Sequence, residues 1–320
     1  MRRTFLSCLA LLACGGLTAG MPTDSSLFNE IRVGDRVLVL QYGPWLENMT
    51  AIDAGPGLVV VDTWSSPSAA AEARNRIVEV FQKPVALVIN THHHWDHTFG
   101  NQAFADVEIM GHRFDPVDMQ NEYGDLDRRR KSIGAALATN PHESIRKYIR
   151  GVIEETDTDL RLTPPNRLVD DRMVLQFGDL AVRFYHVPGL HARTNLTVFV
   201  PDLGLLFTRR EFDGKTLPVL ETGVDLAKLT ESMEDIRRSN MPVRYLIPGH
   251  GQYVEDPDLS IPLAYLLSLG DAVKKAMRSG KNVDTMDVRG GFEAFPQVAS
   301  AQNVHEKNIR ILWDALELQP

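Results

Sequence analysis

The chain has 320 residues, of which 43% are hydrophobic and 24% are charged. This composition is typical of globular proteins and excludes a disordered, collagen-like or coiled-coil chain. The 34 basic and 42 acidic side chains give a formal net charge of −8, which offers no basic surplus for phosphate backbones, so we expect no nucleic-acid partner.

The first twenty residues predict an export signal peptide. Arg2 and Arg3 precede a largely apolar run over residues 5–13, and small residues up to Gly20 allow cleavage. That run is too short to span a bilayer, and no later stretch approaches the necessary length, so no transmembrane span is predicted. We therefore expect an exported protein, either periplasmic or secreted.

Both cysteines lie inside this signal segment. Without Cys8 and Cys14, the mature chain has no disulfide and no thiolate to offer a metal. The residues that end at Cys14 also resemble a bacterial lipoprotein cleavage site, which would place a lipid anchor on Cys14. The alternative is an exported protein without lipid.

The rest of the chain is predicted to comprise a linker over 21–34 and one domain over 35–320 that ends in a C-terminal helical extension. Apolar runs with β-branched residues predict strands at 36–42, 58–62, 85–90, 107–111, 181–186, 196–200, 205–208 and 245–248. Capping and periodicity predict a helix that starts at Ser66 and Pro67, and others at 142–155, 225–239, 259–279 and 304–318. Residues 112–165 are polar and charged, and form either a solvated face or an insertion that covers a site. Strands and helices mix without strict alternation, which predicts a layered α/β domain.

The most informative stretch runs from Thr91 to His97, directly after the strand 85–90. Its four histidines and one aspartate would each need a buried polar partner in a core, and a bound metal supplies that partner. In an extended segment His92 and His94 point to the same side, while Asp96 and His97 lie beyond a turn and can face a neighbouring point. Imidazole and carboxylate ligands without thiolate favour zinc, with iron or manganese as alternatives.

Two more histidines follow strands. His191 and His250 each lie in a glycine-containing turn, where the backbone can approach closely. Because loop-borne sites gather at such strand ends, both are candidate distant ligands.

Together these residues resemble the metallo-β-lactamase superfamily over roughly residues 35–255. The pattern H-x-H-x-D-H, the strand-ending Asp62, the later histidine and the closing Pro-Gly-His-Gly occur in the family order. The resemblance implies an αββα sandwich of two mixed sheets covered by helices, with one or two zinc ions at one edge between the sheets. It implies the following ligands: His92, His94 and His191 for the first metal, and Asp96, His97 and His250 for the second.

The resemblance also implies supporting roles. Asp62 would orient a ligand or its loop. His93 and Trp95 fill the variable positions of the motif and are expected to be structural. His186 is a candidate for lining the site, against the alternative of a strand-end histidine with local hydrogen bonds.

One position departs from the family pattern. Many members carry an aspartate that bridges both metals, and here Arg210 stands in its place, with Glu211 next to it. A guanidinium directed at the second site would repel a metal ion, whereas Glu211 could replace the missing carboxylate. The sequence therefore leaves one metal or two open.

The predicted function is an exported zinc-dependent hydrolase. A zinc-bound water loses its proton near neutral pH and attacks as hydroxide, with Asp96 as the catalytic residue that orients it and accepts the proton. The substrate would be a small molecule with an ester, lactone, lactam or related bond, sulfate and phosphate esters included. The alternatives are iron-dependent sulfur or oxygen chemistry, and a non-catalytic anion-binding protein in which Arg209 or Arg210 blocks the second metal.

Overall fold

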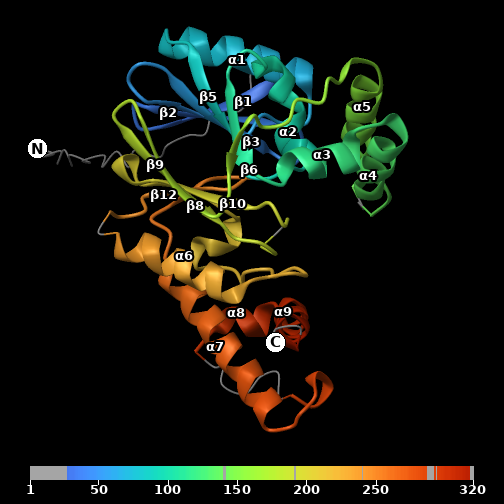
Figure 1. Ribbon diagram of the computed structural model, residues 1–320, viewed down its shortest axis with the longest axis vertical. Helices are drawn as coiled ribbons and strands as arrows, with labels where there is room; N and C mark the ends of the chain where they lie inside the picture. Colours follow the sequence, from blue (N-terminus) through green and yellow to red (C-terminus); the bar gives the residue numbers. More distant parts are fainter. Residues whose placement is uncertain are drawn as a thin grey trace, which may run out of the picture.

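Two β-sheets lie face to face at the centre of the fold (Figure 1). The computed structural model describes residues 27–139, 142–190, 192–239, 241–286, 292 and 294–317. The predicted signal segment with Cys14, and the predicted ligand His191, lie outside the described residues.

The first sheet has seven strands, in the spatial order of the sequence. They are β1 (Phe28–Val33), β2 (Val37–Tyr42), β3 (Glu47–Asp53), β4 (Leu58–Val61), β5 (Val85–Ile89), β6 (Glu108–His112) and β7 (Arg167–Val169). Neighbours from β1 to β4 are antiparallel, and those from β4 to β7 are parallel.

The second sheet has six strands in the order β13-β12-β11-β10-β9-β8. They are β8 (Arg172–Phe177), β9 (Leu180–His186), β10 (Leu196–Val200), β11 (Leu205–Phe207), β12 (Tyr245–Ile247) and β13 (Val254–Glu255). Strands β11 and β12 are parallel, and the other neighbours are antiparallel. The predicted pair of mixed sheets is therefore confirmed.

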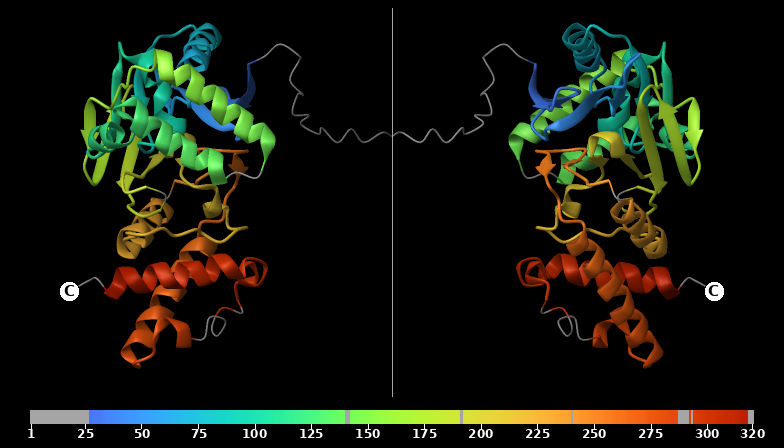
Figure 2. Two further views of the ribbon diagram at one scale, coloured as in Figure 1. Left: turned by 90° about the vertical axis from the view of Figure 1, so that its right-hand side faces the viewer. Right: turned by 90° about the vertical axis from the view of Figure 1, so that its left-hand side faces the viewer.

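Helices cover the outer faces of both sheets, which gives the predicted αββα order of layers (Figure 2). Helix α1 (Pro67–Phe81) buries Ala70, Ala73 and Ile77 against the first sheet, and the Ser66 hydroxyl caps it by accepting from the Ala69 amide at 3.1 Å. The second sheet is covered by helices α6 (Leu226–Arg238), α7 (Ser260–Arg278) and α9 (Gln302–Glu317), with the short α8 (Pro296–Ser300) beside them. Between the sheets lies an apolar core that includes Val39, Val61, Phe184 and Val198.

The polar stretch after β6 forms an inserted helical layer. Its helices are α3 (Asp115–Tyr123), α4 (Leu126–Thr139) and α5 (Glu143–Asp159). Apolar side chains of these helices pack around Trp95 and Phe99, next to the histidine motif. Most of the basic run on α4 is exposed, with Arg130 paired to Asp157 of α5, but Arg129 is half-buried and donates to the Thr156 carbonyl. The insertion thus borders the predicted site as well as carrying an exposed charged face.

Five of the observed strands are absent from the sequence predictions, namely β1, β3, β7, β8 and β13. Within the expected linker over 21–34, residues Phe28–Val33 form β1, which pairs with β2. Strand β3 was not predicted because Glu47, Asn48 and Thr50 interrupt its apolar pattern, although all three are buried. Among the described residues, no helix combines the length and apolarity of a membrane-crossing segment.

Candidate metal centre

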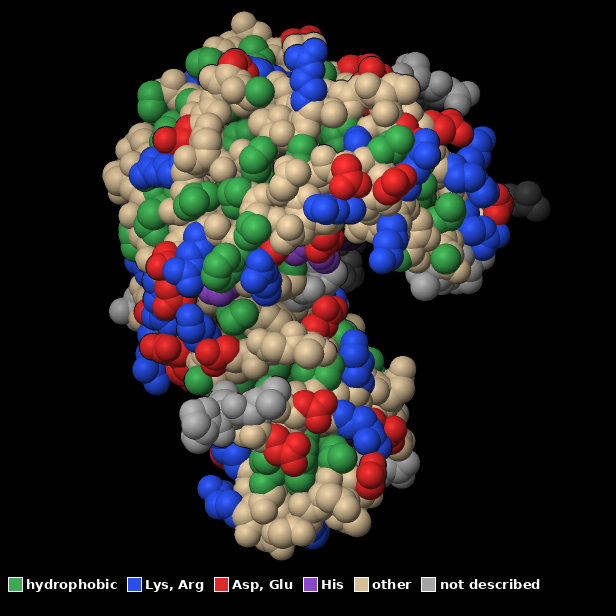
Figure 3. All heavy atoms as spheres, turned by 45° about the vertical axis from the view of Figure 1, so that its right-hand side comes forward, with side chains coloured by type: hydrophobic (Ala, Val, Ile, Leu, Met, Phe, Trp, Pro, Cys, Tyr) green, Lys and Arg blue, Asp and Glu red, His purple; other side chains and the backbone are tan. Residues whose placement is uncertain are grey.

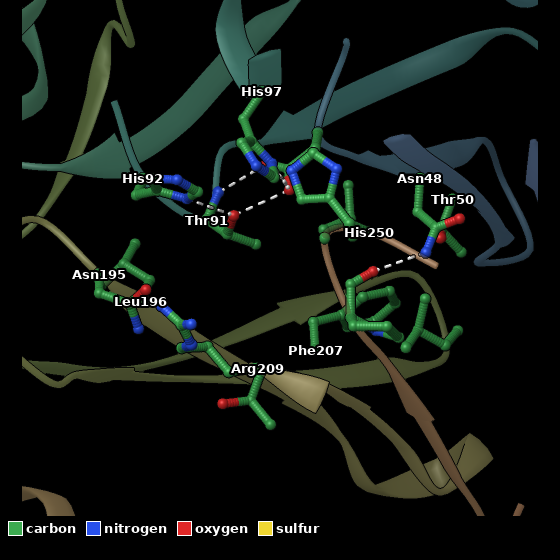
Figure 4. Close-up of a pocket in the computed structure, with 16 residues that line it drawn as sticks. Asn48, Thr50, Thr91, His92, His97, Asn195, Leu196, Phe207, Arg209 and His250 are labelled. Atoms are coloured by element: carbon green, nitrogen blue, oxygen red, sulfur yellow. Dashed lines mark hydrogen bonds and ion pairs between the residues drawn. The ribbon is translucent and has the colours of Figure 1, made fainter. Parts of the chain in front are cut away.

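The site lies where strand ends of both sheets meet. Strands β4 and β5 run parallel with Val61 opposite Ile89, so the residues that follow each strand are neighbours. In the second sheet, β11 and β12 are parallel with Phe207 opposite Ile247, which brings Arg209 and His250 to the same end. Figure 4 shows side chains from both sheets directed toward one another across this end.

A cavity of about 270 Å³ opens between these strand ends. Its lining includes His92, His97 and His250, the Arg209 and Asn195 side chains, and an apolar group made of Val61, Leu196, Phe207 and Ile247. On the surface, histidine side chains are visible at the inner end of the hollow between the sandwich and the C-terminal helices (Figure 3).

Three of the predicted ligands form a compact group. One ligand atom each from Asp96, His97 and His250 lies within 4.8 Å of the others. His250 Nε2 is 3.0 Å from Asp96 Oδ2, and His97 Nε2 is 3.6 Å from the same oxygen. Asp96 and His97 belong to α2 (Trp95–Thr98), a single turn that starts just after His94 and directs both side chains toward the second sheet.

Asp62 orients the His97 ring of this group through a hydrogen bond. Its backbone is left-handed, with φ of 57°, a strained conformation for an aspartate that its buried hydrogen bonds hold in place. Asp62 Oδ1 accepts from the Thr91 amide, and Oδ2 accepts from the Thr91 hydroxyl, each at 2.8 Å. His97 Nδ1 lies 2.8 Å from Oδ2 and donates to it, which leaves Nε2 as the atom that faces Asp96 and His250.

The electrostatics of the group favour a cation. Burial lowers the pKa of His97, but the Asp62 and Asp96 carboxylates outweigh burial and raise it to about 9. Burial would raise the pKa of Asp96, yet His97 and His250 hold it well below its usual range. Two imidazoles and a carboxylate in a negatively charged environment fit a divalent metal, and zinc accepts this donor set.

His92 and His94 lie side by side as predicted for the first metal. Their ring centroids are 4.6 Å apart, and the His92 ring lies 4.1 Å from that of His97. The Thr91 hydroxyl lies 3.1 Å from His92 Nδ1. Two of the three predicted ligands of the first metal are therefore together next to the second group.

At Gly249 the site requires a residue without a side chain. A Cβ at this residue would lie 2.5 Å from His97 Cε1. A side chain at position 249, in the turn before His250, would therefore displace the His97 ring.

Comparison with known proteins identifies the family. The sequence profile of the metallo-β-lactamase superfamily matches residues 42–208, just over half of the chain. The chain belongs to this superfamily. Its two sheets and covering helices form the metallo-β-lactamase fold, and the relatives below carry the names of alkylsulfatases and a metallo-β-lactamase.

Three relatives show the range of the resemblance. A linear primary-alkylsulfatase from Pseudomonas sp. is 25% identical over 233 residues, which cover 63% of this chain and 41% of that protein. The structure of a stereoselective inverting sec-alkylsulfatase from Pseudomonas sp. gives a TM-score of 0.61 at 16% identity and covers 89% of this chain and 49% of that one. A metallo-β-lactamase from Erythrobacter litoralis gives 0.52 at 16% identity, over 77% of this chain and 98% of that one. The chain thus spans half or less of the alkylsulfatases it matches, and the structural likeness shows the shared fold.

Among the described side chains, Arg209 is the arginine that lines the site of this family member. It extends from the end of β11 into the cavity (Figure 4), and its Nη1 donates to the Leu190 carbonyl at 3.2 Å and lies 3.9 Å from Glu221 Oε1. Arg210 begins the 3₁₀ turn Arg210–Asp213, and its side chain is not among those described. The sequence predicted Arg209 or Arg210 near the second metal position, and the structure places Arg209 in the cavity.

His186 does not line the cavity. Its ring stacks on His112 with centroids 3.8 Å apart, and its Nε2 lies 2.6 Å from the Arg193 carbonyl. His186 is therefore a strand-end histidine with local hydrogen bonds, which was the alternative prediction.

Sequence reasoning missed Glu47, a buried carboxyl at the start of β3. It accepts from the Ser65 amide and hydroxyl at 3.0 and 2.9 Å, and from the Tyr148 hydroxyl of α5 at 2.6 Å. Burial, followed by the charge of Asp96, raises the pKa of Glu47 to about 7. The residue pairs with His250 in an isolated β-bridge, so a carboxyl of the first sheet and the inserted helices both reach the metal centre.

Proposed function

We propose that this chain is a zinc-dependent hydrolase of small anionic esters, with alkyl sulfates as the substrate class. The observation that carries the proposal is Arg209, a cationic side chain in the same cavity as His92, His97 and His250. The curated relative named as a linear primary-alkylsulfatase supports the same class.

The lining of the cavity suits a ligand that carries an anionic group on an apolar chain. A guanidinium keeps its charge at every physiological pH and offers paired donors that fit a sulfate or carboxylate edge. The Asn195 amide lies on the same side of the cavity as Arg209 in Figure 4 and adds a neutral donor. In the same lining, Leu196, Phe207 and Ile247 supply apolar surface for the first carbons of a chain. A volume of about 270 Å³ is small for a whole drug-sized ligand, so a longer alkyl chain would extend into the hollow outside.

The metal ligands proposed for zinc are those of the family pattern, for two ions per chain. Zinc at such ligands supplies Lewis acidity and a lowered pKa for bound water. Asp96 stays ionised and is positioned to accept a proton from the attacking water. Asp62 keeps the His97 ring fixed by its hydrogen bond at 2.8 Å. Arg209 would hold the anionic group against the reacting end of the cavity.

The test combines metal analysis with a substrate panel. We expect zinc near two per chain, and turnover of primary alkyl sulfates above that of a β-lactam, a lactone and a phosphate monoester. Iron in place of zinc would overturn the proposed metal. Lactam turnover above sulfate turnover would overturn the proposed substrate class.

Arg209→Gln separates anion binding from chemistry. A hydrogen bond to a charged group contributes about 1.5–3 kcal/mol, so KM for an alkyl sulfate should rise about 10- to 100-fold. Turnover of an uncharged ester should stay within about twofold, and Arg172→Gln, on β8 with its side chain paired to Glu231, is the matched control. An equal loss on charged and uncharged esters would show that Arg209 does not bind the anion.

We also infer that the protein is exported, from the sequence of residues 1–20. Expression in a bacterial host should place the mature chain in the periplasm, with a mass that lacks this segment. A lipid anchor would instead give a membrane-bound form that begins at Cys14 with added acyl mass, and a full-length cytoplasmic product would refute export.

A further inference from the structure

His93 stands between two predicted ligands but faces away from the cavity. Its side chain is 5% exposed. On one side its Nδ1 lies 2.9 Å from Thr194 Oγ1, and on the other its Nε2 lies 3.1 Å from Glu122 Oε1. The His93 amide also donates to Thr194 Oγ1 at 3.2 Å. Both ring nitrogens are therefore used inside the protein, and neither is directed at the metal centre.

Thr194 belongs to the loop that joins β9 to β10 in the second sheet. Two residues further on, the Leu196 amide donates to the Thr91 carbonyl at 2.7 Å. The histidine segment is thus attached to this loop at Thr91 and again at His93, on either side of His92. By sequence, the predicted ligand His191 lies in the same loop, three residues before Thr194.

Helix α3 holds the same loop from outside. Arg193 forms a paired ion contact with Asp118, with Nε 2.6 Å from Oδ2, and its guanidinium lies 4.6 Å from the centre of the Phe114 ring. Glu122, from the same helix, holds the far nitrogen of His93. Helix α3, His93 and the β9–β10 loop therefore form one connected network of hydrogen bonds and ion pairs, in which His93 is buried and Arg193 and Glu122 are partly exposed.

We propose that His93 is a positioning residue for the first metal position. Its imidazole fixes the Thr194 hydroxyl, and this contact keeps the segment with His92 and His94 in register with the β9–β10 loop. The inference rests on the metal-binding part of the proposed function and is independent of the substrate.

The two ring nitrogens make different contacts, and this difference allows a sharp test. A hydrogen on Nε2 satisfies the Glu122 carboxylate and leaves Nδ1 to accept from the Thr194 hydroxyl. The asparagine amide overlays the Nδ1 side of an imidazole, whereas the glutamine amide overlays the Nε2 side. His93→Asn therefore retains the Thr194 contact, and His93→Gln retains only the Glu122 contact.

The experiment measures zinc affinity at both positions by competition with a chelator, in the parent and in four variants. Residues that orient metal ligands typically contribute 10- to 100-fold in metal affinity. We expect a loss of this size at the first position in His93→Gln and in Thr194→Val. His93→Asn should stay within about threefold of the parent, as should His142→Ala, an exposed histidine at the start of α5. Zinc affinity at the second position, on Asp96, His97 and His250, should change less than threefold in every variant.

Cobalt substitution and thermal unfolding of the metal-free proteins complete the test. The visible absorption of cobalt at the first position should change in His93→Gln and return in His93→Asn, while the metal-free Tm values of the two variants agree within about 3 °C. Rescue by glutamine rather than asparagine, parental affinity in both His93→Gln and Thr194→Val, or equal losses at both metal positions with a lowered Tm would each overturn the inference. If the parent binds no zinc, both this inference and the proposed zinc chemistry fail, whereas absent sulfate turnover in a zinc-loaded parent defeats only the proposed substrate.

Discussion

Replacing Asp62 with asparagine should weaken both the fold and the metal centre. The two carboxylate oxygens accept three hydrogen bonds of 2.8 Å, two from Thr91 and one from His97 Nδ1. An asparagine has only one acceptor oxygen. If that oxygen takes the place of Oδ2, the hydrogen bonds from the Thr91 hydroxyl and from His97 remain. The amide nitrogen then replaces Oδ1, and the hydrogen bond from the Thr91 amide is lost. Because Asp62 is buried, we expect a loss of about 1.5–3 kcal/mol in the free energy of unfolding. Zinc affinity at the position of His97 should fall about 10- to 100-fold.

Urea unfolding of the metal-free protein and chelator competition of the zinc-loaded protein measure the two effects separately. Asp179→Asn is the matched control, because this carboxylate is 60% exposed and pairs with Arg36 at the surface. An exposed pair contributes at most about 1 kcal/mol, and zinc affinity should not change in the control. Parental zinc affinity in Asp62→Asn would refute the role given to Asp62.

Three further predictions concern Gly249, Tyr148 and Asp115, the last a buried carboxyl at the start of α3 that accepts from the His112 amide. Gly249→Ala should reduce zinc binding at the second position by displacing the His97 ring, which its Cβ would approach to 2.5 Å, and a titration that still gives two tight zinc ions would contradict this. Tyr148→Phe should lower the free energy of unfolding by about 1–3 kcal/mol, because the buried Glu47 carboxyl loses a donor at 2.6 Å; a urea midpoint equal to that of the parent would argue against it. Burial raises the pKa of Asp115 to about 7, so the folded protein retains a proton there that the unfolded chain has released. Stability should therefore fall as the pH rises from about 4 to about 7, by roughly 4 kcal/mol at most. Unfolding curves at pH 5 and pH 8 should show that Asp115→Asn removes this part of the slope, and an unchanged slope would exclude Asp115 as its source.

The strand ends were predictable because their signals are local. A short apolar run followed by a polar or glycine-rich turn marks both β5 and β12, and both strands end within one residue of the predicted boundary. The family motif then ordered the ligands, and the structure brings Asp96, His97 and His250 within reach of a common metal.

The rest of the site depends on pairing that no local pattern encodes. Glu47 reads as a solvated turn residue, yet it is buried because Ser65 and Tyr148, 18 and 101 residues away, supply its hydrogen bonds. Likewise, Arg209 enters the cavity because β11 pairs in parallel with β12, a contact between segments about 40 residues apart in sequence. Only tertiary structure shows that the Arg209 side chain faces inward.

The two sheets are joined by main-chain hydrogen bonds at the end that carries the metal centre. The Asn48 amide donates to the Gly249 carbonyl at 2.8 Å, the Gly251 amide to the Leu46 carbonyl at 2.9 Å, and the Leu196 amide to the Thr91 carbonyl at 2.7 Å. Separating the sheets here would break all three bonds together with the core beneath them, so these amides should exchange with deuterium only when the whole domain unfolds. A ligand of this cavity would then enter through movement of side chains and loops at the rim, while the hydrogen-bonded floor of the site stays rigid.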